Sequence, residues 1–278
     1  MKNIFIFTLF ILFLINKNTV ILNILTTYNM WLTTLLPIIF PTLIITDLLL
    51  TTDLPNKINK LPLKLYSKIF KCKQIGLYIF IMSIIGATPT NAKILNNLYK
   101  NNSIDINDIN KILTSCIFFN PILIIKLCNL KILIIMYISN ILTGIILRNN
   151  IKISNVNKLP IINIKYDINE SISSSISIIF NILGTVLFFS VISTLISTNN
   201  LYINILTNGL LEITNGLNLI HLIDNLYIKD IISMILISFS SISIFIQIKS
   251  IINNIDTYYY FKSRIITLII SVILIIII

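Results

Sequence analysis

Long apolar runs separated by short polar segments make up most of this chain. The first run extends from Ile4 to Ile15 and could continue to Leu25, and no small-residue cleavage site follows it, so we expect it to be retained. Further runs occupy residues 31–50, 113–128, 130–147, 171–197, 230–249 and 265–278. Because about 20 apolar residues make a helix long enough to cross a bilayer, the pattern predicts a helical protein with several membrane spans.

Two short stretches of small and polar residues interrupt this pattern. The first, Gly86–Lys93, follows an apolar run (75–85) that is too short to cross a bilayer. Gly and Pro break helices, and unpaired backbone groups at membrane depth are tolerated only within protein or beside water. The stretch is therefore either the tip of a re-entrant hairpin at a substrate site or an interfacial turn. The second, Gly209–Gly216, also lies between short apolar pieces and contains Glu212.

Composition and charge narrow the class of protein. The chain is 56% hydrophobic and only 11% charged, whereas soluble domains carry roughly 25% charged residues. The apolar runs are continuous, which disfavours a β-barrel. Although the net charge is +11, the lysines cluster between apolar runs, in segments 53–73, 93–111 and 148–165. This distribution follows the positive-inside rule, so we expect these segments to be cytoplasmic and expect no nucleic-acid partner.

A hairpin at the first interruption gives a self-consistent topology with those three segments on one side. The second interruption then enters the membrane from the opposite face, which is typical of inverted-repeat transporters. The predicted fold is an all-α polytopic membrane protein, an inverted repeat with two re-entrant or broken helical hairpins. We expect four parts: an N-terminal membrane span and linker (1–30), a first repeat (31–147), a basic cytoplasmic linker (148–170) and a second repeat (171–278).

Polar residues within the interruptions are the candidates for function. An acid inside apolar sequence is costly and indicates a functional site by default. Glu212 is predicted to bind a coupling proton or cation or to pair with Lys93; the alternative is a structural partner for the broken backbone. Lys93 is predicted to contact an anion, or else to extend towards the lipid headgroups. Further solute-binding candidates are Thr88, Thr90, Asn91, Asn120, Thr214, Asn215 and Gln247.

Other residue types give no indication of metal binding or catalysis. The three cysteines form no C-x-x-C pair, and His221 is the one histidine of the chain, so no metal site is expected. Motifs of hydrolases, metalloproteases and phosphate loops are missing, and we expect neither an enzyme nor a cofactor. Asp47 and the aromatic, basic segment that ends at Arg264 are predicted to lie at the membrane interface.

Several motifs together resemble those of a known family. Gly86–Lys93 is similar to Gly-Tyr-Pro-x-Gly-Ala-Lys, with Pro89, Ala92 and Lys93 retained, and Gly209–Gly216 closely matches Gly-Leu-Leu-Glu-x-Thr-x-Gly. Weaker matches are the proline-bearing span 37–49, Phe119-Asn120-Pro121, 239–247 and Arg264. From about Trp31 to Arg264 the chain resembles the YlbJ-like sporulation integral membrane proteins, which contain a nucleoside-recognition, or Gate, domain and are distantly similar to concentrative nucleoside transporters.

The resemblance implies a transporter that moves a small anionic solute, dipicolinic acid, across the outer forespore membrane. The chain departs from the family pattern at Thr88, Asn91 and Ser240-Ser241, where the family has tyrosine, glycine and a glycine pair. Two alternatives remain: a Gate-domain transporter of a nucleoside-like or other small solute, and a non-transporting scaffold or assembly factor of the forespore envelope. The expected partners are the lipid bilayer, the anionic solute and a coupling proton or cation, with oligomer formation left open.

Overall fold

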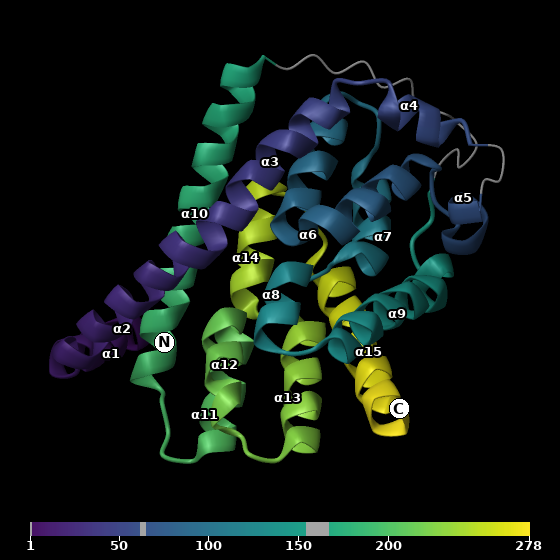
Figure 1. The fold of residues 1–278 in the computed structure, drawn as a ribbon. Helices are drawn as coiled ribbons and strands as arrows, with labels where there is room; N and C mark the ends of the chain where they lie inside the picture. The colour runs from purple at the N-terminus through teal and green to yellow at the C-terminus, as the bar shows by residue number, and fades with distance from the viewer. Residues whose placement is uncertain (1, 62–64, 154–166) are drawn as a thin grey trace.

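A computed structural model describes residues 2–61, 65–153 and 167–278, and every regular element within these ranges is helical (Figure 1). The N-terminal half contains α1 (Lys2–Ile15), α2 (Lys17–Met30), α3 (Leu36–Leu50), α4 (Leu54–Asn59), α5 (Leu65–Phe70), α6 (Ile75–Lys100), α7 (Ile106–Cys116), α8 (Pro121–Leu127) and α9 (Leu130–Ile146). The C-terminal half contains α10 (Ile168–Leu195), α11 (Leu201–Leu211), α12 (Ile213–Leu219), α13 (Leu226–Phe239), α14 (Ile242–Ile251) and α15 (Thr257–Ile277).

Seven helical segments within the described residues are long and apolar enough to cross a membrane. They are Lys17–Leu50, Ile75–Lys100, Ile106–Leu127, Leu130–Asn149, Ile168–Leu195, Leu226–Ile251 and Thr257–Ile277. Large apolar side chains such as Ile134, Phe180 and Ile269 project from the outer helices and are exposed. Lipid covers such surfaces at no cost, so the prediction of a helical multi-pass membrane protein is confirmed.

The prediction of a linker just before Trp31 is wrong. A π-helical turn, Trp31–Leu35, joins α2 to α3, so Lys17–Leu50 is one continuous helical segment. The polar residues of α2 find partners that favour the helix, since Thr27 Oγ1 lies 2.8 Å from Ser190 Oγ on α10. Packing against α10 therefore stabilises a helix where the sequence pattern indicated a connection.

The helix α6 is broken in its interior. Ala87 lies in the left-handed region with φ 58° and ψ −166°, and Thr88 is extended with φ −89° and ψ 134°. A non-glycine residue with positive φ is uncommon and interrupts the regular helical backbone. The break divides α6 into two arms, 75–86 and 89–100.

The two arms of α6 run in opposite directions. Beside the start of the first arm, Lys73 Nζ lies 2.5 Å from Asp108 Oδ2, near the beginning of α7. At the break, the backbone N–H of Thr88 donates to the carbonyl of Phe118, just beyond the end of α7 (3.0 Å). The second arm ends at Lys100, and only residues 101–105 separate it from α7. The first arm therefore starts, and the second arm finishes, near the beginning of α7, whereas the break between the two arms lies near the end of α7.

The helices α11 and α12 form a second reversal around Glu212. The backbone of Glu212 is extended, with φ −140° and ψ 112°, between two helical residues. A Cβ placed on Gly216 would lie 2.4 Å from Gly209 Cα, so the two helices touch through their backbones. In Figure 1 this hairpin lies at the lower end of the molecule, whereas α6 and α7 are joined at the upper end.

Two further segments are interrupted without reversing. Residues 117–120 separate α7 from α8, and the side chain of Asn120 caps α8 by accepting from the N–H of Ile122 (2.9 Å). Ser240 and Ser241 separate α13 from α14, with φ values of 66° and 47°. The described residues thus contain four helical segments with a break in their middle.

Lysine-rich segments gather at the upper end in Figure 1. Lys71 Nζ donates to Asn149 Oδ1 (2.7 Å), and Lys111 Nζ donates to the carbonyl of Ile151 (3.0 Å). These contacts bring the described parts of the three predicted cytoplasmic segments together, as the positive-inside rule requires. Of the predicted linker 148–170, residues 154–166 lie outside the described residues.

Candidate functional site

The four interrupted segments meet in the interior at a small cavity, which we name the central cavity; three of them meet there at their breaks, and the fourth contributes α14, which follows its break. Its volume is about 30 Å³, which is room for about one water molecule. Its lining residues are Leu35, Ile39, Thr88, Pro89, Phe119, Asn120, Leu123, Ile182, Val186, Glu212, Ile213, Thr214, Ile244 and Gln247. Each of the four broken segments contributes to this lining, so segments far apart in sequence enclose one site.

Glu212 is the acid of the central cavity. Only 2% of the residue is exposed, and its Oε2 accepts hydrogen bonds from the backbone N–H of Asn215 (3.0 Å) and from Thr214 Oγ1. Within the described residues Glu212 forms no ion pair. Because a buried carboxylate without a counter-charge is strongly disfavoured, the group is expected to hold a proton or a cation.

Other predicted candidates surround Glu212. Thr88 Oγ1 is buried and has no hydrogen-bond partner among the described residues. Gln247 Nε2 donates to Ser243 Oγ (3.1 Å), and Asn120 caps α8 beside the cavity. The structure thus brings together five candidates predicted from the sequence: Thr88, Asn120, Glu212, Thr214 and Gln247.

Three other candidates lie outside the central cavity. Asn91 Nδ2 donates to the carbonyl of Cys116 and so ties the second arm of α6 to the end of α7. Thr90 is fully buried on the same arm. Asn215 lies on the opposite side of the Glu212 turn, where it lines a different cavity.

Two predicted placements of Lys93, at the headgroups and beside Glu212, are wrong, whereas its contact with an anion stays a prediction. Lys93 Nζ lies 2.5 Å from Asp47 Oδ2 and donates to Ser175 Oγ (2.7 Å). Lys93 is only 3% exposed, so it does not reach the headgroups. The second arm of α6 leads away from the break, and this direction carries Lys93 towards α3 and α10.

Asp47 is a buried residue that the sequence interpretation placed at the membrane interface. It is 1% exposed and accepts hydrogen bonds from Asn97 Nδ2 (2.9 Å) and Ser171 Oγ (2.8 Å) as well as pairing with Lys93. The signal that could have identified it was an acid within the apolar run 31–50, the same signal that identified Glu212.

Arg264 also lies in the interior rather than at the predicted interface. It is fully buried, and its guanidinium donates to Asn140 Oδ1 (3.1 Å) and to the carbonyl of Ile117 (3.4 Å). Ile117 follows the last residue of α7, where helix carbonyls have no partner within the helix. Arg264 therefore stabilises the α7–α8 break through a hydrogen bond from α15 and links α15 to α9 through Asn140.

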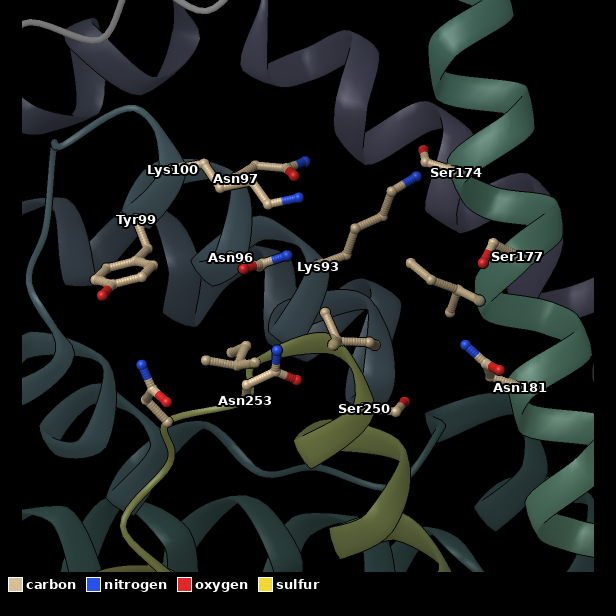
Figure 2. A pocket seen from close by; sticks show the side chains of 14 residues that line it. Lys93, Asn96, Asn97, Tyr99, Lys100, Ser174, Ser177, Asn181, Ser250 and Asn253 are labelled. Carbon is tan, nitrogen blue, oxygen red and sulfur yellow. The ribbon is translucent and has the colours of Figure 1, made fainter.

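Two larger cavities, each of about 490 Å³, lie on either side of the central cavity. The basic vestibule is lined by Lys93, Asn96, Asn97, Tyr99, Lys100, Ser174, Ser177, Ile178, Asn181, Ser250, Ile251, Ile252, Asn253 and Asn254 (Figure 2). The amide vestibule is lined by Thr19, Asn23, Thr26, Thr27, Met30, Thr194, Ser197, Asn204, Asn208, Asn215, Asn218, Leu219 and His221.

The helix α10 passes all three cavities in order. Its residue Ser177 lines the basic vestibule, Ile182 lines the central cavity and Thr194 lines the amide vestibule. At 1.5 Å per residue, Ser177 and Thr194 are about 26 Å apart along the helix, close to the thickness of a hydrocarbon core. The three cavities therefore form a row along α10, from one side of the expected membrane to the other.

Comparison with protein-family models, with curated proteins and with solved structures gives no match for this chain. The row of cavities and its buried acid are consequently the features on which a functional interpretation rests.

Proposed function

We propose that this protein is a multi-pass membrane transporter that moves a small polar solute through the row of three cavities. The observation that carries the proposal is the central cavity, where two helical hairpins that enter from opposite ends of the molecule meet beside Glu212, a buried acid without an ion-pair partner among the described residues. Broken helices at membrane depth are tolerated where they line a solute site. Because the cavity holds about one water, passage of a solute requires the hairpin tips to separate.

We further propose that the two halves are inverted repeats. At a spacing of 124 residues, the tip residue Thr88 corresponds to Glu212. The same spacing aligns identical residues: Leu77-Tyr78-Ile79 with Leu201-Tyr202-Ile203, and Thr90-Asn91 with Thr214-Asn215. Each half also has the same order of elements, namely a long span, a hairpin, an interrupted span and a final span.

Contacts between the final spans, α9 and α15, support this symmetry. Thr143 Oγ1 lies 2.8 Å from Thr267 Oγ1, and Arg264 donates to Asn140, so each residue contacts the one 124 positions away. Residues contact their own equivalents where a two-fold axis passes between them. An inverted repeat would let the two vestibules open alternately, as in other transporters of this architecture.

Glu212 is the proposed coupling group. A carboxyl group that is buried when the tips are closed and hydrated when they separate would bind a proton or cation in a conformation-dependent way. Its replacement by Gln keeps the acceptor for the N–H of Asn215 but removes the charge. The substitution therefore separates the capping role of Glu212 from its ionic role.

The test is solute uptake by purified protein in liposomes under an imposed proton gradient. The panel comprises pyridine-2,6-dicarboxylate, succinate, uridine and glycerol. We expect the wild type to accumulate at least one of them above protein-free liposomes, and Glu212→Gln to lose nearly all of this activity. Glu170→Gln is the matched control, because Glu170 is the other glutamate of the chain and lies exposed at the start of α10.

Full activity of Glu212→Gln would refute the coupling role. A correctly folded wild type that moves no member of the panel would favour the alternative of a non-transporting scaffold.

The sporulation role and the cargo dipicolinic acid remain proposals supported by the sequence resemblance alone. They predict that a deletion strain makes spores with low dipicolinic acid content, restored by the wild-type gene but not by Glu212→Gln. Normal content in the deletion strain would remove the dipicolinate assignment and leave a transporter of another solute, such as a nucleoside.

A further inference from the structure

The basic vestibule differs from the other two cavities in charge. Lys93 and Lys100 line it together with asparagine amides and serine hydroxyls, and none of its described lining residues is acidic. The described lining of the amide vestibule contains no lysine, and that of the central cavity contains Glu212. The row of cavities is therefore electrostatically asymmetric, with cationic groups at one end.

Lys93 links three helices at the wall of the basic vestibule. It belongs to the second arm of α6 and bonds to Asp47 on α3 and to Ser175 on α10. Figure 2 shows its side chain extending towards α10, on which Ser174 and Ser177 also lie. An ammonium group has three N–H donors, and these two partners occupy two of them, so one remains for a ligand.

Asp47 would keep partners if Lys93 released it. Asn97 Nδ2 donates to its Oδ1 (2.9 Å) and Ser171 Oγ donates to its Oδ2 (2.8 Å). The two donors lower the cost of leaving the carboxylate without a counter-ion. The pair is thus arranged so that Lys93 can exchange one anionic partner for another.

We infer that the basic vestibule is a binding site for a small organic or inorganic anion, and that the anion replaces Asp47 as the counter-ion of Lys93. The inference rests on the proposed transport function, because it names the class of solute that the pathway takes. Carboxylate and phosphate groups both accept hydrogen bonds from ammonium and amide N–H groups, and the lysines and asparagines of this lining provide such donors. A cationic solute would meet two lysines without a described acid to bind it.

The exchange would also affect the central cavity. The arm that carries Lys93 begins at Pro89, next to the tip residue Thr88, and both line the central cavity. Loss of the bond to Asp47 removes one of the two polar contacts that tie this arm to α3, the other being the hydrogen bond from Asn97, and so leaves the tip less constrained. Loading of the vestibule is therefore coupled to the movement that passage requires.

The first test is ligand protection of an introduced cysteine. In purified wild-type background, Ser177→Cys is labelled with N-ethylmaleimide in the presence of succinate, inorganic phosphate, choline or glycerol. An anion at ten times its Kd should slow labelling about tenfold, whereas choline and glycerol should not. Ser197→Cys, an exposed serine of the amide vestibule, is the matched control and should show no protection.

Comparison of succinate with phosphate identifies the anionic group that is preferred. Protection by glycerol or choline equal to that by both anions, or protection by none of the four, would overturn the inference.

The second test removes the ion pair without leaving a lone buried charge. Asp47→Asn combined with Lys93→Gln replaces the pair by two amides of similar size. We expect the Kd of the anion, measured from its protection of Ser177→Cys, to rise at least about tenfold in this background, equivalent to about 1.4 kcal/mol of binding free energy. Unchanged protection would show that Lys93 does not hold the anion.

Glu212→Gln separates this inference from the proposed function. We expect it to lose uptake while keeping anion protection of Ser177→Cys, because Glu212 does not line the basic vestibule. Uptake without anion protection would refute the vestibule site and keep the transporter. Anion protection in a wild type that moves no solute would refute transport, and with it the transport role of the vestibule.

Discussion

At the scale of single residues, hydrogen bonds between side chains hold the interior together. Thr143 and Thr267 are fully buried, and their hydroxyls lie 2.8 Å apart between α9 and α15. Each hydroxyl also lies within hydrogen-bond distance of a carbonyl of its own helix, at Ser139 and Ser263. Because lipid and apolar side chains offer no replacement partner, losing one hydroxyl leaves the other less well satisfied.

We expect Thr143→Val and Thr267→Val each to lower the unfolding free energy by about 1 kcal/mol. The double variant should cost less than the sum, since it removes both hydroxyls and leaves neither without its partner. Unfolding of the detergent-solubilised protein by a denaturing detergent measures all three variants. Strictly additive losses would show that the two hydroxyls do not interact.

At the scale of elements, close backbone contact defines the α11–α12 hairpin. A Cβ on Gly216 would lie 2.4 Å from Gly209 Cα and 2.9 Å from a methyl of Leu236, so neither a backbone atom nor a packed side chain leaves room. Two helices whose backbones touch need residues without side chains at the contact. The glycines are therefore what allows Glu212 to sit at the turn between two short helices.

We expect Gly216→Ala to force the arms of this hairpin apart and to cost roughly 1–3 kcal/mol of stability. Gly184→Ala on α10 is the matched control, because nothing lies within 4 Å of the added Cβ. That control should be neutral or stabilising by up to about 1 kcal/mol, since Ala favours a helix over Gly. Thermal denaturation in detergent measures both, and equal midpoints would contradict the contact.

At the scale of the whole molecule, the two ends of the row of cavities differ in the charge of the residues around them. Lysine-rich segments surround the end at which the basic vestibule lies, and the amide vestibule lies at the other end of α10. The positive-inside rule predicts that the first end faces the cytoplasm. Opposite accessibility of the two vestibules is therefore a property that can be measured in intact membranes.

We expect Ser177→Cys to react with a membrane-impermeant thiol reagent in inside-out vesicles, and Ser197→Cys to react in right-side-out vesicles. The wild type serves as the control for the native cysteines. Among these, burial raises the pKa of the Cys72 thiol above its ordinary value, which keeps it unreactive. Labelling of both variants from the same side would refute the proposed arrangement of the vestibules.

The sequence by itself determined the class of the protein and the positions of its two hairpin turns. Apolar runs of sufficient length and a small share of charged residues require lipid around helices, and this requirement does not depend on how the helices pack. Gly, Pro and a single acid within apolar sequence identified the turns at Ala87–Thr88 and Glu212, because those residues are unfavourable in an unbroken membrane helix.

Only the tertiary structure decided which polar residues share a site. Thr88, Asn120, Glu212 and Gln247 come from four broken segments, and no local pattern shows that these segments meet. The same applies to Lys93, for which Glu212 was one of the predicted partners and whose partner is Asp47 on another helix. A buried charge is stabilised by whatever group packing brings within a few ångströms, so its partner depends on how the helices cross, which helical periodicity does not encode.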